Sequence, residues 1–185
     1  MLRAMTGSNL RNAYGGESMA HMRYKFWGDI AENEGFPNVA RLFRAIAYAE
    51  QVHSSNHFRA HRNVFGLHEA VSGAAFGVGS TSENLQGAIE GENFEIREMY
   101  PVYLNAARFQ EEKEAERSFH YALSAERIHA SMFQEAKQSV EAGKDLELNS
   151  VGICDNCGYT IEGEIPEKCP ICGVARNRFS SFDSQ

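Results

Sequence analysis

Hydrophobic residues recur at intervals of three and four positions through most of the chain, from about residue 8 to residue 143. This spacing places them on one face of an α-helix. Two stretches interrupt the pattern, the short "NEGFPN" at 33–38 and the longer "FGLHEAVSGAAFGVGSTS" at 65–82. The pattern therefore predicts four long helices, with a tight turn after the first and a long connection after the second.

The residues at these interruptions favour defined helix ends. Gly35 suits the left-handed conformation that closes a helix, and Pro37 suits the first turn of the next one. A serine or threonine at 80–82 can cap the third helix, with Glu83 as the partner in a capping box. We expect the third helix to span about 81–109 and the fourth about 113–143, although neither glycine nor proline marks the boundary between them.

The four helices contain an internal repeat. The segment "FRAIAYAEQVH" aligns with "FHYALSAERIH", and each is preceded by a Gly-Glu pair, at 16–17 and at 91–92. Two helical hairpins of similar pattern, neither of which can bury its hydrophobic face alone, pack into a four-helix bundle. The repeat therefore predicts a mainly α fold.

Acidic and imidazole side chains of the repeat fall within the hydrophobic stripes. On the second helix, Glu50 and His53 continue the stripe that begins at Leu42, and Glu126 and His129 take the equivalent positions on the fourth. The first and third helices contribute glutamates to the same interior. The side chains predicted to face the core are Glu17, Glu50, His53, Glu92, Glu95, Glu126 and His129.

A core that holds five carboxylates needs positive charge, because each buried carboxylate without a partner costs several kcal/mol. Two metal ions would bring four charges in the divalent state and six in the trivalent, which suits a redox pair. Oxygen-rich ligation with one imidazole per ion favours iron or manganese over zinc. A single Glu-x-x-His is commonly a coincidence on a solvated helix, but two copies in phase with the stripes favour a di-metal site.

Length and charge restrict the remaining alternatives. The 185 residues allow one well-packed domain and a small appendage. A net charge of −7 and the lack of a basic run argue against a nucleic-acid partner. With no signal-like segment and no stretch of about 20 apolar residues, we expect a soluble, cytoplasmic protein.

All four cysteines, Cys154, Cys157, Cys169 and Cys172, lie near the end of the chain as two C-x-x-C pairs. Two such pairs offer four thiolates to one tetrahedral ion, which favours a metal site over disulfides. Gly158 and Gly173 each follow a second cysteine, where a left-handed residue lets backbone amides approach sulfur. The spacing alone does not separate iron from a structural zinc. We predict two domains, a helical bundle over 1–145 and a linker with the cysteine module over 146–185.

The whole chain resembles rubrerythrin, a ferritin-like bundle joined to a rubredoxin-like domain. The segments "GESMAHMRY", "AEQVH", "GENFEIREMYP", "AERIH" and "CDNCGYTIEG...CPICG" stand in the family's order. The resemblance implies that Glu17, Glu50, Glu92 and Glu126 bind or bridge two irons, with His53 and His129 as imidazole ligands. It implies that Glu95 is an additional carboxylate, exchanging with His53 as one iron shifts on oxidation.

The resemblance also implies that Tyr24 and Tyr100 hydrogen-bond ligand carboxylates. Tyr24 is two turns from Glu17 and lies on its face. Tyr100 is eight residues from Glu92, about 80° away from its line on a regular helix. Only a local distortion of the third helix would direct Tyr100 inward. His21 and His57 lie one turn from proposed ligands but are not part of the motif.

By resemblance, the function is reduction of hydrogen peroxide to water at a di-iron centre. Electrons would come from a donor protein, such as a rubredoxin or a reductase, through a mononuclear Fe(Cys)4 site. The alternatives are a ferroxidase that handles iron and a non-enzymatic scaffold with a structural zinc ribbon. The connection at 67–80 would have to span a bundle about 40 Å long. We therefore expect a homodimer. A domain swap stays open, in which this segment passes to another chain and one chain's cysteine module serves its neighbour's di-iron centre.

Overall fold

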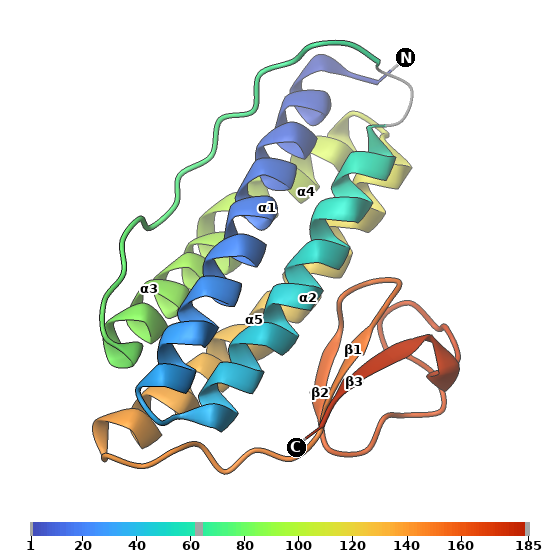
Figure 1. The fold of residues 1–185 in the computed structure, drawn as a ribbon. Helices are drawn as coiled ribbons and strands as arrows, with labels where there is room; N and C mark the ends of the chain where they lie inside the picture. Colours follow the sequence, from blue (N-terminus) through green and yellow to red (C-terminus); the bar gives the residue numbers. More distant parts are fainter. Residues whose placement is uncertain (1, 62–64, 184–185) are drawn as a thin grey trace.

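The computed structural model describes residues 2–61 and 65–183 and shows a helical bundle with a small β-module beside it (Figure 1). The mainly α architecture and the four-helix arrangement predicted from the repeat are confirmed. The helices pair as two hairpins, with α1 against α2 and α3 with α4 against α5. Their bounds are α1 Ala4–Asn33, α2 Pro37–Ala60, α3 Thr81–Phe94, α4 Tyr100–Phe109 and α5 Lys113–Glu141.

The helix ends follow the local signals in the sequence. Gly35 adopts a φ of 88° after α1, a left-handed conformation that glycine reaches without steric cost. Pro37 occupies the first turn of α2. Ser80 and Glu83 form a complete capping box at the start of α3, where the serine side chain accepts from the Glu83 amide and the glutamate accepts from the Ser80 amide. These predicted boundaries are confirmed.

The third predicted helix is not a regular α-helix from end to end. A π-helical segment, η1 (Glu95–Met99), joins α3 to α4. A π-turn closes its hydrogen bonds over five residues, so it inserts one extra residue into the α-helical pattern. Each residue of an α-helix turns by about 100°, and the insertion therefore shifts every side chain of α4 by about that angle.

Residues 65–80, which precede α3, run along the outside of the bundle from one end to the other (Figure 1). This segment is extended and mostly exposed, and a few hydrogen bonds hold it to α1, among them Val71 N to Asn12 Oδ1 and Trp27 Nε1 to the carbonyl of Gly77. The described residues 65–80 are therefore long enough to span the bundle. The domain swap remains a prediction.

Two hydrophobic clusters fill the bundle, and the polar residues of the repeat lie between them. One cluster contains Tyr24, Trp27, Phe43 and Phe133, whose rings contact one another. The other includes Leu10, Tyr100 and Phe119. Along each of α1, α2 and α5, the acidic and imidazole positions separate the two clusters, so they form a polar layer inside an apolar core.

The C-terminal module contains a three-stranded antiparallel sheet in the order β2-β1-β3. Its strands are β1 Val151–Cys154, β2 Thr160–Glu162 and β3 Phe179–Phe182. Val151 and Ile153 pack against Ala45 and Ala49 of α2, and the guanidinium of Arg41 donates to three backbone carbonyls of the linker and β3. The module therefore lies on the bundle of its own chain. The predicted division at residue 145 stays an expectation.

Among the residues that the structure describes, none of the helices is long and apolar enough to cross a membrane.

Candidate metal centres

The structure brings six of the predicted ligand residues together in the polar layer of the bundle. Glu17 comes from α1, Glu50 and His53 from α2, Glu92 from α3, and Glu126 and His129 from α5. All six are buried, with at most 1% of each residue exposed. Each of the four long helical segments thus contributes to one cluster.

These six residues form two overlapping groups of four. One group contains Glu17, Glu50, His53 and Glu126, and the other contains Glu50, Glu92, Glu126 and His129. In each group one ligand atom per residue lies within 4.8 Å of all the others. Glu50 and Glu126 belong to both groups. The arrangement suits two neighbouring ions, each with one histidine and one glutamate of its own and two carboxylates that bridge the pair.

Unpartnered oxygen atoms show that the cluster fits metal ions. One carboxylate oxygen of each of the four glutamates is buried without a hydrogen bond, namely Glu17 Oε2, Glu50 Oε1, Glu92 Oε2 and Glu126 Oε1. Buried acceptors are normally satisfied, and leaving one unsatisfied costs about 1–3 kcal/mol. Cations placed between these oxygens would satisfy them together.

When no metal ion is bound, protons on the carboxylates and imidazoles supply the positive charge that the buried cluster needs. Burial, reinforced by the charges of Glu50 and Glu126, raises the pKa of Glu92 to about 8 and raises the pKa of Glu17 well above its usual range. Burial opposes the charged forms of His53 and His129, but the neighbouring carboxylates outweigh it and raise the pKa of both rings. The cluster therefore holds protons that metal binding must displace.

The imidazole rings direct their Nδ1 atoms at the two carboxylates that both groups share, those of Glu50 and Glu126. His53 Nδ1 lies 2.8 Å from Glu50 Oε2 and 3.0 Å from Glu126 Oε1. His129 Nδ1 lies 2.8 Å from Glu126 Oε2 and 3.2 Å from Glu50 Oε1. The two Glu-x-x-His motifs thus meet face to face, and Nδ1 is the nitrogen available to a metal in each.

Glu17 and Glu92, the terminal glutamates that belong to only one of the two groups, each accept a hydrogen bond from a buried tyrosine. Tyr24 donates to Glu92 Oε1 at 2.6 Å, and Tyr100 donates to Glu17 Oε1. The π-helical segment supplies the distortion that the sequence required, since it turns Tyr100 from its regular-helix position into the core. Burial raises the pKa of both phenols, so both hydroxyl groups keep their protons.

His57 extends this network away from the metal cluster. Its Nε2 lies 3.0 Å from the Tyr100 hydroxyl and its Nδ1 lies 2.8 Å from Ser118 Oγ. Burial, with the charge of His53, lowers the pKa of His57 to about 3, so the ring is neutral. His21 bonds instead to the backbone carbonyl of Ala47. His57 thus bonds to a residue, Tyr100, that itself donates to a candidate ligand.

Glu95 stands outside both groups of four. It begins the π-helical segment and is half-buried. Burial and the charges of Glu17, Glu126 and Glu92 raise the pKa of its carboxyl group well above the usual range. The side chain thus lies near the cluster without joining it, and its role as an exchanging ligand stays a prediction.

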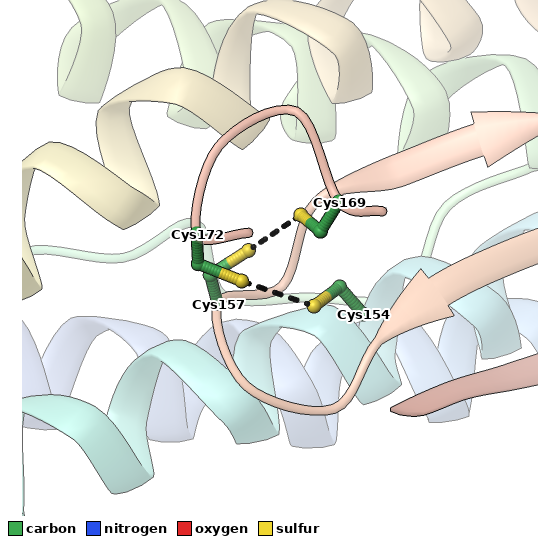
Figure 2. A group of neighbouring side chains, drawn as sticks. All are labelled: Cys154, Cys157, Cys169 and Cys172. Atoms are coloured by element: carbon green, nitrogen blue, oxygen red, sulfur yellow. Dashed lines mark hydrogen bonds between the residues drawn. The ribbon is translucent and has the colours of Figure 1, made fainter. Parts of the chain in front are cut away.

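The four cysteines meet in a second candidate site (Figure 2). Cys154 Sγ lies 3.6 Å from Cys172 Sγ, and Cys157 Sγ lies 3.5 Å from Cys169 Sγ. These separations exclude disulfides, in which the sulfur atoms are about 2.0 Å apart. They are close to the edge of about 3.8 Å that four sulfur atoms make around a tetrahedral ion at 2.3 Å.

The backbone after the second cysteine of each pair is left-handed, as predicted. Gly158 and Gly173 have φ values of 79° and 77°. Hydrogen bonds from the Cys157 thiol and from the amides of Asn156 and Cys157 lower the pKa of Cys154 to about 5, against the effect of burial. Amide donors of this kind stabilise the thiolates that a metal needs.

The two candidate sites touch each other. Gly158, next to Cys157, packs so closely on the ring of His53 that an added Cβ would lie 2.1 Å from His53 Nε2. Thr160 Oγ1 lies 2.8 Å from His129 Nε2. Sequence reasoning did not single out Thr160, because nothing in the local pattern of a strand signals which distant helix it meets.

Comparisons with known proteins agree with this architecture. A family model described as rubrerythrin matches residues 8–137, and one described as the rubredoxin-like domain of rubrerythrin matches residues 153–180. Rubrerythrin-2 of Clostridium acetobutylicum is 55% identical over 97% of this chain and 97% of its own length. Nigerythrin of Nitratidesulfovibrio vulgaris is 32% identical over 96% of this chain and 86% of its own length.

Solved structures give the same result. The structure of fully reduced, all-ferrous nigerythrin superposes with a TM-score of 0.84 at 31% identity and covers 98% of this chain and 89% of that one. Symerythrin from Cyanophora paradoxa, reduced with dithionite, has a TM-score of 0.65 at 20% identity over 76% of this chain and 88% of its own, which shows a common fold. The candidate centres are therefore a di-iron carboxylate–histidine site and a rubredoxin-like four-cysteine site.

Proposed function

The chain belongs to the rubrerythrin family, and from this membership we propose that it is a non-haem di-iron peroxidase. The proposed reaction reduces hydrogen peroxide to water, with electrons relayed through an Fe(Cys)4 site. When bound, a pair of ferrous ions supplies the two electrons that reduction of one hydrogen peroxide to two waters requires.

The observation that carries the proposal is the pair of four-residue groups that share Glu50 and Glu126. A shared pair of carboxylates supports two ions close enough to act on one small oxidant. We assign Glu17 and His53 to one ion and Glu92 and His129 to the other. Glu95 is proposed as an additional carboxylate that exchanges with His53 as a ligand.

The buried tyrosines and His57 would hold the surrounding protons in place. Tyr24 and Tyr100 donate to the terminal glutamates and so orient them. The neutral ring of His57 joins Tyr100 to Ser118, which borders a polar cleft beside the cysteine module. This network supports a supply of protons to the oxygen atoms of peroxide as they are reduced.

Contact between the two sites supports electron transfer within one chain. Gly158 follows a cysteine ligand and lies against His53, so no bulk solvent separates the two sites at this point. Cys172 is half-buried, unlike the other three cysteines, and offers the more open side of its site to an electron-donor protein such as a rubredoxin or a reductase. We further propose a homodimer that works in the cytoplasm, where thiolates stay reduced.

The decisive experiment compares two oxidants on the anaerobically reduced, iron-loaded protein. We expect rapid loss of hydrogen peroxide, two electrons consumed per peroxide, and slow reaction with dioxygen. Faster dioxygen-driven deposition of ferric iron would instead identify a ferroxidase. Protein as purified with zinc at the cysteines and no iron in the bundle would instead identify a non-enzymatic scaffold with a structural zinc ribbon.

A matched variant separates the two sites in this experiment. Cys157→Ser removes one thiolate of the cysteine site and none of the bundle ligands. We expect it to consume one equivalent of peroxide after chemical reduction but to lose sustained turnover with a donor protein. Sustained turnover in this variant at the wild-type rate would contradict the proposed relay.

A further inference from the structure

Thr160 is a buried residue of the cysteine module that reaches into the bundle. It begins strand β2, it is 1% exposed, and its hydroxyl oxygen lies 2.8 Å from His129 Nε2. The same hydroxyl lies 3.1 Å from the backbone carbonyl oxygen of Gly158. One side chain thus links the loop after Cys157 to the imidazole of a candidate iron ligand.

The two partners of this hydroxyl fix the direction of both hydrogen bonds. A threonine hydroxyl has one hydrogen to donate, and a carbonyl oxygen can only accept. The hydrogen is therefore directed at Gly158, and the threonine oxygen accepts from His129 Nε2. His129 must carry a proton on Nε2, which leaves Nδ1 of the neutral ring as the nitrogen with a free lone pair.

This nitrogen is the one that faces the carboxylates. His129 Nδ1 lies within hydrogen-bond distance of Glu126 and Glu50, and 3.8 Å from Glu92. We infer that Thr160 is a positioning residue that sets the tautomer and the ring orientation of His129, so that the cysteine module completes the di-iron site. The inference rests on the proposed role of His129 as a ligand and does not depend on the oxidant.

The other histidine has no such anchor. His53 Nε2 is buried without a hydrogen-bond partner among the described residues, and the module residue that lies against it, Gly158, has no side chain. Thr160 and Gly158, two residues of one short segment, therefore make different contacts with the two imidazoles. His129 is held by a hydrogen bond, whereas His53 is only in contact. The two metal positions should differ in affinity, and Thr160 should affect one of them.

The test is a competition between the protein and a chelator for ferrous iron, without oxygen, on protein whose cysteine site is already filled. Thr160→Val keeps the shape of the side chain and removes the hydroxyl. We expect one of the two bundle ions to bind about 10- to 100-fold more weakly, the usual effect of losing a hydrogen bond to a ligating histidine. Thr160→Ser keeps the hydroxyl and should retain both affinities.

Two controls separate the possible failures. An unchanged thiolate-to-iron absorption band in Thr160→Val shows that the cysteine module is intact. His129→Ala should lose the same ion that Thr160→Val weakens, and retention of that ion would contradict the ligand assignment itself. If His129→Ala loses the ion while Thr160→Val binds both ions like the wild type, the inference about Thr160 is wrong.

A second readout needs no variant. In zinc-loaded wild-type protein, nitrogen NMR of His129 should show hydrogen on Nε2, protected from exchange with solvent, and metal on Nδ1. Hydrogen on Nδ1, or metal on Nε2, would overturn the inference even if Thr160→Val failed to fold.

Discussion

The hydroxyl group of Tyr100 reaches the carboxylate of Glu17 because a π-helical segment precedes it. On a regular helix Tyr100 would lie about 80° from the line of Glu92. The inserted residue of Glu95–Met99 turns it back by about 100°, so that it is fully buried and donates to Glu17. The distortion thus gives Glu17 the counterpart of the hydrogen bond that Tyr24 gives Glu92.

Removing either phenol hydroxyl should weaken one metal position. Tyr100→Phe takes the donor from Glu17, and Tyr24→Phe takes it from Glu92, without loss of ring volume. We expect about a tenfold loss of affinity for one ferrous ion in each variant. Chelator competition measures this, and the double variant should weaken both ions. Equal weakening of both ions by either single change would refute the assignment of one tyrosine to each position.

The metal-free protein should become less stable as pH rises from about 4.5 to 8. The pKa of Glu92 is about 8 in the folded protein and near its ordinary value of 4.5 when the protein is unfolded. Between these values the folded state binds more protons, so rising pH favours unfolding. The raised pKa values of Glu17, His53 and His129 act in the same direction.

Urea unfolding of the metal-free protein at pH 5 and pH 8 measures this effect. Glu92→Gln cannot ionise and should show a smaller decrease. Iron-loaded protein should show the opposite trend, because ions bind more tightly once the ligands lose their protons. A metal-free protein that is more stable at pH 8 than at pH 5 would contradict the buried, protonated cluster.

His57 should make the protein sensitive to acid. Its pKa is lowered by burial from the ordinary value of 6.5 to about 3 in the folded protein. Below pH 6.5 the imidazole of His57 binds a proton in the unfolded state but not in the folded state, so the free energy of unfolding falls as pH decreases towards 3. His57→Gln keeps a side chain that can hydrogen-bond but does not titrate. The difference in unfolding free energy between wild type and variant should therefore change with pH over this range and be constant above about pH 7.5.

Gly158→Ala should disturb the di-iron site, whereas Gly173→Ala should not. Both glycines follow the second cysteine of a pair and have positive φ, so alanine strains both backbones by about 1 kcal/mol. At Gly158 the new methyl group collides with His53, whereas a Cβ at Gly173 has no neighbour within 4 Å among the described residues outside its own chain neighbours. We expect weaker iron binding in the bundle of Gly158→Ala alone. Identical iron affinities in the two variants would show that the contact with His53 does not matter.

Local signals in the sequence were enough to predict the elements and the polar layer. Helix ends at Gly35, Pro37 and Ser80 depend on backbone preferences that act within a few residues, and the structure has them where the signals lie. The inward position of Glu50 and Glu126 follows from their phase in the hydrophobic stripes. Hydrophobic periodicity is a property of one helix, so it can be recognised in the sequence without knowing which helices pack against it.

Relationships between elements were harder to predict. The π-helical segment itself contains no glycine or proline, although Pro101 follows it by two residues, and it was the demand that Tyr100 face inward that indicated a distortion. Thr160 lies 31 residues from His129 in the sequence, on another module, and no local pattern reports their contact. The overlap of the two ligand groups at Glu50 and Glu126 also depends on how the hairpins dock.

The long external connection divides the ligands evenly between two parts of the chain. Glu17, Glu50 and His53 precede it, and Glu92, Glu126 and His129 follow it. Because each ion would take ligands from both hairpins, bound metal would link the two halves of the bundle through its interior. A chain cut in the exposed connection should therefore hold its two halves together more tightly when it is loaded with iron than when the iron is removed, because the shared hydrophobic clusters then act without the ligand bonds.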